Sequence, residues 1–300
     1  METDALYDDL RPLLFSVAYR MTGSVADAED LVQEAFVRYE RTASGQIESP
    51  KAYLSTIVTR LAIDHLRSAR VRREEYVGDW LPEPLVAEEA PDPAETADSL
   101  SLAFLVVLET LSPVERAVFL LREVFGYEYA EIARVVGKSE ANCRQIAARA
   151  RRHVDARRPR FEASREQREE LADRFFAACA EGDTDALVEL LARDAVVYGD
   201  GGGKAPQLAR AVHGSDRAAR LLAGWFELAR ALGAQLRRVV VNGQPGLVVQ
   251  SPAGEVASVL ALDIADGQVQ TVRSIVNPDK LRHLGPVADV RAALRARRAP

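Results

Sequence analysis

Residues 127–153 carry the pattern that most restricts how this chain can fold. Gly137 interrupts a helical stretch, and glycine adopts the left-handed backbone that ends a helix at little cost. Ser139 follows it and is a suitable N-cap for a second helix. In that second helix, apolar residues recur at spacings of three and four and so share a buried face: Cys143, Ile146, Ala147, Ala150 and Val154. The segment therefore predicts a helix-turn-helix.

The opposite face of the second helix favours DNA binding. Asn, Gln and Arg side chains can form paired hydrogen bonds with base edges, and residues 142–153 include no acid. We expect Arg144, Gln145 and Arg149 to reach bases, and Arg152 to contact phosphate as Arg151, Arg157 and Arg158 would. The predicted DNA-binding residues of this helix are thus Asn142, Arg144, Gln145, Arg149 and Arg152. The alternative is a surface helix hairpin whose charges are merely solvated.

Charge is distributed unevenly along the 300 residues, whose net charge is −6. Residues 74–98 hold nine acids and no base, and four prolines interrupt them. Such a composition resists packing and predicts an extended linker. The segments before and after it are rich in arginine, and phosphate binding depends on such local patches rather than on the total charge. Inside the linker, Trp80–Leu85 is an apolar island, either a turn that covers its own tryptophan or a docking motif that another surface holds.

Two helices stand out in the segment before the linker, about residues 5–73. One begins near Asp27, with Leu31, Ala35, Phe36 and Tyr39 on its inner side and Asp27, Asp30 and Glu34 outside. The next opens with Ser49-Pro50, a cap followed by a first-turn proline. Its predicted outward residues are Lys51, Thr59, Arg67 and Arg70. They could follow a phosphate backbone, and the loop 42–49 could accept an unstacked base.

The pattern changes after residue 161. Helical periodicity covers 163–181, 183–191 and 215–232, and strand-like runs occupy 194–198, 235–242, 246–250, 255–263 and 268–276. Helices followed by a run of strands predict an α+β domain in which a curved sheet wraps a helix. The tail 286–300 contains several arginines and could be a packed helix or a basic arm.

The first 155 residues resemble an extracytoplasmic-function sigma factor of bacterial RNA polymerase. The stretch 27–36 is similar to the family helix that grips the clamp helices of the polymerase β′ subunit. Residues 49–54 and 64–67 resemble the promoter −10 helix, which assigns Lys51, Arg67 and Arg70 to DNA. Leu111–Arg116 and the helix-turn-helix resemble region four, which reads the −35 element. The resemblance implies polymerase contacts for five residues: Asp27, Asp30, Leu31, Gln33 and Glu34.

The whole chain resembles the sigma-factor subgroup with a fused C-terminal SnoaL-like domain. The match rests on Trp80-Leu81-Pro82-Glu83-Pro84, on Asp200-Gly201-Gly202-Gly203-Lys204, and on Asn277-Pro278-Asp279-Lys280-Leu281. The implied fold is two all-α sigma domains, a region 2 helical bundle and a region 4 helix-turn-helix, followed by a cone-shaped α+β domain. We expect region 2 at 1–73, an acidic linker at 74–99, region 4 at 100–160, the SnoaL-like domain at 161–285 and a basic tail at 286–300.

The three motifs of this subgroup suggest a regulatory contact. The glycines at 201–203 do not form a phosphate-binding loop, since Lys204 is followed by Ala205-Pro206 rather than by Ser or Thr opening a helix. They more simply permit a tight turn and the close approach of another segment. We expect the turn 200–204 and the segment 277–281 to contact Trp80–Pro84. The C-terminal domain would then hold the linker and set the spacing of the two DNA-binding lobes.

The predicted partners are RNA polymerase core, through its β′ clamp helices and β subunit, and promoter DNA. A small molecule could occupy a pocket of the C-terminal domain, with Asp200, His213 and Asp263 as polar candidates to line it. No cofactor, metal site, catalytic activity or membrane association is expected. Cys143 and Cys179 are expected to be buried free thiols. The acidic N-terminus has no signal-peptide pattern, so the sequence favours the cytoplasm.

Two other functions compete with this interpretation. A one-component transcription regulator would bind an operator through the helix-turn-helix and an effector through the SnoaL-like domain. A SnoaL-like cyclase or isomerase with a DNA-binding appendage is the third. The helix 27–36 separates the first two, because an operator-binding regulator has no need of a polymerase-binding helix.

Overall fold

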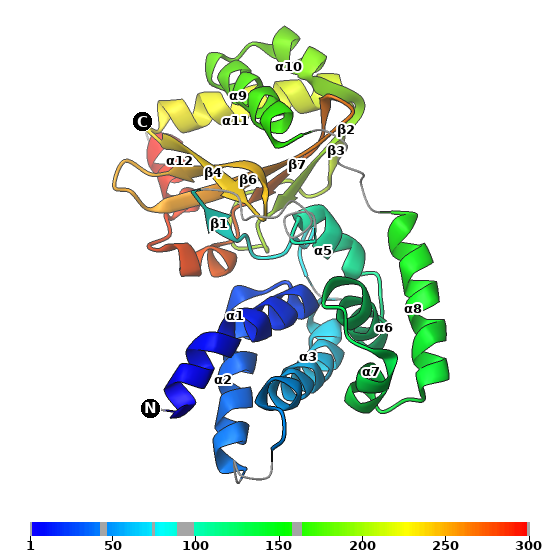
Figure 1. Cartoon of the computed structure of the whole chain (residues 1–300). Coiled ribbons are helices and arrows are strands. Elements are labelled where there is room, and N and C mark those ends of the chain that lie inside the picture. The colour runs from blue at the N-terminus through cyan, green and yellow to red at the C-terminus, as the bar shows by residue number, and fades with distance from the viewer. Residues whose placement is uncertain (1, 43–46, 74–75, 89–98, 158–163, 299–300) are drawn as a thin grey trace. The chain divides into compact units, whose positions relative to one another are not determined.

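The computed structural model describes residues 2–42, 47–73, 76–88, 99–157 and 164–298. The chain forms two compact units (Figure 1). The first combines Met1–Glu75 with Leu105–Arg158, and the second combines Tyr76–Phe104 with Pro159–Pro300. The chain therefore crosses from one unit to the other three times, and the described part of the linker belongs to the second unit.

The first unit begins with three helices, α1 (Glu2–Thr22), α2 (Val25–Arg41) and α3 (Pro50–Arg73). Ser24 caps α2, since its hydroxyl accepts a hydrogen bond from the Asp27 backbone N–H at 3.1 Å. The face of α2 toward α1 and α3 is apolar and includes the buried Val32, Ala35 and Phe36. The predicted region 2 helical bundle is confirmed.

The rest of the first unit is also helical. It contains α6 (Pro113–Phe119), the π-helical turn η2 (Leu120–Val124), α7 (Tyr129–Val136) and α8 (Glu140–Asp155), and α5 (Leu102–Leu108) leads into it. Ser112 and Glu115 form a capping box that starts α6. Val118, Ile132 and Cys143 belong to one buried cluster, which packs α6, α7 and α8 together.

The second unit is built on a seven-stranded mixed sheet with the order β1-β4-β5-β6-β7-β2-β3. The strands are β1 (Val86–Ala87), β2 (Leu191–Asp200), β3 (Val212–His213), β4 (Gln235–Val241), β5 (Gln244–Gln250), β6 (Val256–Ala265) and β7 (Gln268–Ile275). Only the β2–β7 pair is parallel among the described strands. β4 and β5 are joined through Asn242-Gly243, both with positive φ (51° and 76°), as a tight hairpin requires.

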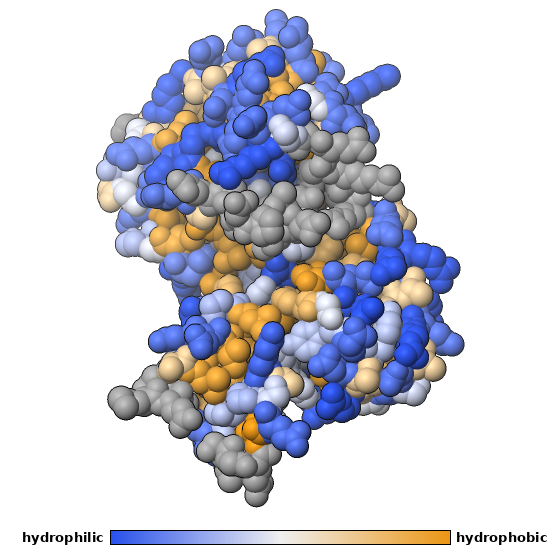
Figure 2. Space-filling model, in the orientation of Figure 1, coloured by the Kyte–Doolittle hydropathy of each residue, from blue (hydrophilic) through white to orange (hydrophobic). Residues whose placement is uncertain are grey.

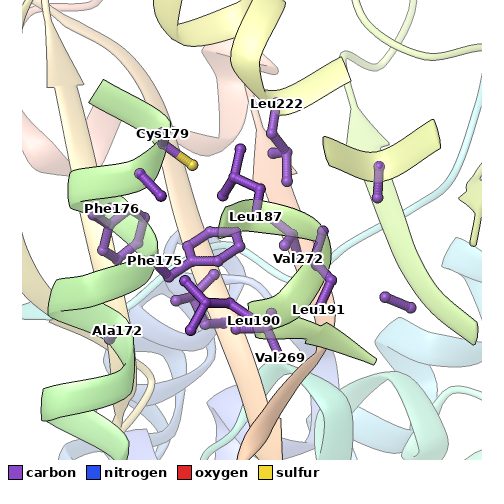
Figure 3. Packing of buried hydrophobic residues seen from close by; sticks show 14 of the residues in the cluster. Ala172, Phe175, Phe176, Cys179, Leu187, Leu190, Leu191, Leu222, Val269 and Val272 are labelled. Carbon is purple, nitrogen blue, oxygen red and sulfur yellow. The ribbon is translucent and has the colours of Figure 1, made fainter. Parts of the chain in front are cut away.

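Three helices, α9 (Arg165–Glu181), α10 (Thr184–Leu190) and α11 (Ser215–Ala231), cover one face of this sheet (Figure 1). Their apolar sides meet the sheet in a cluster of buried side chains, where Phe175 and Leu222 lie near Val272 (Figure 3). The expected α+β domain is confirmed. The tail forms a helix, α12 (Val290–Arg298), which agrees with the first of its two predicted alternatives.

The prediction that the linker resists packing is wrong for residues 76–88. Val86 and Ala87 form β1, which pairs antiparallel with Val241 and Val240 of β4 and is the edge strand of the sheet. Leu81, Pro82 and Pro84 are buried. The apolar side chains of Trp80–Leu85 can be buried although the rest of the linker is acidic. The neighbouring strand β4 then provides backbone hydrogen bonds for Val86 and Ala87. Residues 89–98 lie outside the described part of the chain.

Candidate functional site

The helix-turn-helix consists of α7 and α8 and follows the local signals of the sequence. Gly137 ends α7 with φ 66° and ψ 40°, the left-handed conformation expected there. The Ser139 hydroxyl accepts a hydrogen bond from the Asn142 backbone N–H at 3.3 Å and so caps α8. All five predicted inner residues of α8 are buried. Both cysteines are buried free thiols, and burial raises the pKa of each.

The outer face of α8 is hydrophilic (Figure 2). Its predicted DNA-binding residues are all exposed: Asn142, Arg144, Gln145, Arg149 and Arg152. Arg144 pairs with Glu140 at 2.7 Å, and Arg151 pairs with Glu123. Both arginines are more than half exposed, so these pairs contribute little stability and can be exchanged for a phosphate. The face can therefore bind an anionic duplex without first breaking a buried contact.

The outward residues of α3 agree only in part with the sequence prediction. Lys51 and Arg67 are exposed, and Arg67 pairs with Asp64 at 3.0 Å. The side chain of Arg70 and loop residues 43–46 lie outside the described part of the structure. Thr59 was predicted to face outward, and this is wrong: it is 0% exposed, and its hydroxyl donates to the Ser55 carbonyl at 2.8 Å. The reason is a second covered side of α3, which α6 and α7 pack against.

Arg60 on α3 joins the two helical parts of the first unit. Its guanidinium donates to the carbonyls of Arg134 (2.7 Å) and Val135 (3.0 Å), which end α7. A cation at a helix C-terminus is favourable because unsatisfied carbonyls gather there. The Tyr127 hydroxyl also donates to the Ser55 hydroxyl at 2.9 Å. The proposed −10 and −35 helices thus belong to one packed unit, which sequence periodicity could not show.

The candidate polymerase-binding helix α2 presents a polar outer side. Asp30, Gln33 and Glu34 are exposed, and Glu34 pairs with Arg38 at 2.7 Å. Asp27 is half-buried and lies 3.3 Å from His65 on α3. Leu31 is only 8% exposed, so it packs inside the bundle rather than offering a surface. Three polar residues therefore remain available to a partner on this side of α2.

Asp200, at the end of β2, is the centre of the contact that holds the linker. It is 0% exposed, and its carboxylate accepts hydrogen bonds from the Tyr76 hydroxyl and from the Leu81 backbone N–H, the latter at 2.8 Å. Lys280 donates to the same carboxylate at 2.6 Å and also to the Leu81 carbonyl. We call Asp200, Asn277 and Lys280 the linker grip. Its members come from two of the three motifs, and it binds the third.

Aromatic rings of the linker complete the surroundings of the buried Lys280 ammonium group. It lies 4.3 Å from the Trp80 ring centroid and 4.9 Å from that of Tyr76. Both distances fit cation–π interactions, and such interactions are stronger where water is excluded. Asn277 donates to the Tyr76 hydroxyl at 2.8 Å. Burial, followed by the neighbouring Asp200 carboxylate, raises the pKa of Tyr76, so its hydroxyl stays protonated as a donor.

The glycine turn 201–203 allows the linker to approach closely. Gly202 and Gly203 have positive φ, 54° and 69°. A Cβ at Gly202 would collide with the Asn277 amide and crowd the Tyr76 hydroxyl, and one at Gly203 would lie 3.3 Å from Val77. Lys204, at the end of the turn, pairs with Asp279. The turn therefore serves contact between segments, as expected from its residues.

A second contact, not predicted from the sequence, holds the linker further along. The Asn242 side chain accepts a hydrogen bond from the Leu85 N–H and donates to the Leu100 carbonyl, both at 2.9 Å. His283 Nε2 lies 2.8 Å from the Pro84 carbonyl. The sequence predicted Asn242 only as the last residue of the strand-like run 235–242, with nothing local to mark its side chain as a contact of the linker. Tyr76 and His283 gave no signal beyond lying next to the linker motif and the 277–281 motif.

Asp263 and His213 are the other two polar residues that were expected to line a ligand pocket. Asp263 forms a buried ion pair with Arg273 on the neighbouring strand. Burial lowers the pKa of Arg273 to about 10, and its guanidinium lies 5.7 Å from the Tyr198 ring centroid. His213 is an exposed residue of the short strand β3. Within the described residues, no cluster of His, Cys, Asp and Glu could hold a metal ion, and no helix is long and apolar enough to cross a membrane.

Comparison with known proteins agrees with this geometry. The family models Sigma-70 region 2, Sigma-70 region 4 and SnoaL-like domain match residues 6–72, 101–154 and 172–276. The chain is 41% identical over 286 residues to the ECF RNA polymerase sigma factor SigJ of Mycobacterium tuberculosis, covering 91% of each chain. It is 36% identical over 277 residues to the probable ECF RNA polymerase sigma factor SigI of that species, covering 90% of this chain and 92% of the relative.

A solved structure shows the same family likeness across almost the whole chain. The crystal structure of Mycobacterium tuberculosis extracytoplasmic function sigma factor SigJ aligns with a TM-score of 0.73 and 39% identity. The alignment covers 93% of this chain and 98% of that one. All three domains are therefore part of the likeness.

Proposed function

The chain belongs to the extracytoplasmic-function RNA polymerase sigma factors, and from that premise we propose that it directs core polymerase to specific promoters while its SnoaL-like domain controls activity through the linker. The proposed division is promoter −10 and polymerase binding by 1–73, −35 binding by 100–160, and control by 161–285 acting on 74–99. Bacterial transcription takes place in the cytoplasm, which is where the protein would act.

The outer face of α8 supports the DNA-binding part of the proposal. Its exposed Arg144, Gln145 and Arg149 belong to the residue types that read base edges in the major groove. Arg152 and the neighbouring arginines are suited to phosphates, which fix position rather than sequence. Lys51 and Arg67 of α3 would follow the backbone near the −10 element.

The linker grip is the single observation that carries the regulatory part. A sigma factor must place its two DNA-binding parts at a set separation, and the linker joins them. Asp200 and Lys280 bury a segment of that linker against the SnoaL-like domain. A domain that holds the linker in this way can restrict which separations the chain reaches, so releasing the grip should change promoter-dependent transcription.

In vitro transcription with core polymerase tests both parts of the proposal. Promoters would be selected from random-sequence DNA by the reconstituted holoenzyme. We expect specific transcripts only when core and the full chain are both present. The one-component regulator would be favoured instead if the free chain bound the selected sequence as tightly as the holoenzyme does.

A variant of the linker segment that the grip binds tests the regulatory part separately. Trp80→Ala removes a ring that covers the Lys280 ammonium group, and it should change the level of specific transcription. Glu88→Ala, at an exposed position in the same linker, is the matched control. Chains ending at residue 160 and at residue 285 show whether the whole SnoaL-like domain or only the tail acts. Unchanged transcription by Trp80→Ala would refute control through the linker.

A further inference from the structure

Asp79 directly precedes Trp80 in the linker segment that the linker grip binds. Its side chain is half-buried, and its Oδ2 atom is buried without a hydrogen-bond partner among the described residues. A carboxylate oxygen loses its hydration on burial, and this loss is unfavourable unless hydrogen-bond donors replace the water. Asp79 therefore opposes the binding of the segment, whereas Trp80 and Leu81 beside it make favourable contacts with the SnoaL-like domain.

The charges around Asp79 compensate its carboxylate poorly. Asp200 of β2 and His213 of β3 lie close enough to act on it, and of these two only His213 can carry a positive charge. Lys280, in the turn after β7, already donates to the Asp200 carboxylate at 2.6 Å. Two carboxylates therefore meet one buried ammonium group where the linker is held. Like charges repel more strongly where burial lowers the local dielectric constant.

The protonation of Asp79 is coupled to the hold on the linker. Burial, followed by the neighbouring Asp200 carboxylate, raises the pKa of Asp79 above its ordinary value, and His213 opposes this rise. The held state of the linker thus prefers the protonated side chain. By linkage, the contribution of Asp79 to the hold is most favourable below its ordinary pKa and is lost as the pH rises through the raised pKa. At a pH above both values, the charged carboxylate weakens the hold in full.

We propose that Asp79 is a built-in opponent of the linker grip, which lets the linker be released while the SnoaL-like domain stays folded. A hold made only of favourable buried contacts would be hard to open, because separating the partners of a buried ion-pair network is costly. The Asp79 carboxylate reduces the free-energy difference between the held and released linker, since it regains its water on release. This inference rests on the proposed function only where it concerns transcription.

Hydrogen exchange of the full chain, read by mass spectrometry of peptides from residues 76–88, measures how often the linker is released. The Leu81 N–H, which donates to Asp200, is protected only while the segment is held. Asp79→Asn and Asp79→Ala should both slow this exchange several-fold at about pH 8, since each removes the charge. Glu88→Gln removes a carboxylate from an exposed position of the same linker and, as the matched control, should leave the exchange unchanged.

The pH dependence of the exchange separates the charge of Asp79 from its shape. The ratio of the wild-type rate to the Asp79→Asn rate cancels the intrinsic pH dependence of exchange and the titration of Asp200 and His213, which both chains contain. This ratio should fall as the pH is lowered from about 8 to about 5, because the wild-type side chain takes up a proton. A ratio that stays constant with pH, or variants that exchange as fast as the wild type, overturns the inference.

Transcription with core polymerase distinguishes failure of this inference from failure of the proposed function. Asp79→Asn should shift specific transcription in the direction opposite to Trp80→Ala, because the first variant tightens the hold and the second loosens it. Slower exchange with unchanged transcription would refute control through the linker and leave the role of Asp79 intact. Unchanged exchange in Asp79→Asn, with transcription still altered by Trp80→Ala, would refute the role of Asp79 alone.

Discussion

Asp200 and Lys204 lie four residues apart in the same turn, yet their ion pairs differ in how much they matter for the stability of the fold. The Asp200–Lys280 pair has side-chain exposures of 0% and 8%, while the Lys204–Asp279 pair has 57% and 37%. Removing one partner of a buried pair leaves an uncompensated charge in the interior, whereas an exposed pair is replaced by water. The turn therefore combines a structural ion pair with one of small energetic value.

Substituting these residues should separate the two kinds of ion pair. Asp200→Asn is expected to destabilise the second unit by about 3 kcal/mol or more, because Lys280 stays buried and charged. Lys204→Ala, the matched control, should cost less than about 1 kcal/mol. Both tryptophans, Trp80 and Trp225, lie in the second unit, so urea unfolding followed by tryptophan fluorescence measures it selectively. Equal losses in the two variants would contradict this account.

Arg149 and Arg152 on α8 are expected to differ in what they contribute to DNA binding. Arg149→Ala should weaken the preferred −35 sequence by about 1–3 kcal/mol and leave other sequences less affected, since a base contact is lost. Arg152→Ala should weaken all sequences alike and make the salt dependence shallower by about one unit of slope. Competition binding by the holoenzyme at several salt concentrations measures both. The same salt slope and selectivity in the two variants would disprove the assignment.

The contact between α3 and α7 belongs to the scale of whole elements. Arg60 binds the carbonyl end of α7, and Tyr127, just before α7, bonds Ser55, which also lies on α3. Two interactions across one interface are energetically coupled, because loosening either one changes the position of the other. Arg60 therefore acts as a helix cap supplied by a distant helix.

A double-mutant cycle tests this coupling. Arg60→Ala and Tyr127→Phe together should depart from additivity by about 0.5 kcal/mol or more, measured by hydrogen exchange of the α7 and α8 amides. Arg60→Ala combined with Lys204→Ala is the control, since Lys204 belongs to the other unit. That second cycle should be additive. Strict additivity in the first cycle would mean that the two contacts act independently.

Elements and single residues differed in how far the sequence could predict them. The helix-turn-helix was predictable because its signals are local: a glycine with positive φ, a serine cap and apolar spacing. Thr59 was misplaced because one helix can bury two sides when a segment far along the chain covers it. Asn242 was missed because its hydrogen bonds to Leu85 and Leu100 join residues more than a hundred positions apart. Composition alone also misjudged the linker, whose apolar island outweighs its acids.

On the scale of the whole molecule, the chain path makes the linker a connection in its own right. The chain leaves the first unit before Tyr76, returns near Leu105 and leaves again after α8. A cut between α8 and α9 would therefore divide the chain into two fragments without separating the linker from the surface that binds it. Those fragments would remain joined by the linker grip, the β1–β4 pairing and the Asn242 contacts.

A specific protease site inserted between residues 158 and 163 tests this connection. After cleavage, the two fragments of the wild-type chain should still migrate together in gel filtration at micromolar concentration. Asp200→Asn should let them separate, because the grip then loses its buried anion, whereas Lys204→Ala should not. The uncleaved chain with the same insertion is the control for folding. If the wild-type fragments separate at once, the linker contacts are too weak to restrict the two DNA-binding parts, and control through the linker would require another partner to hold it.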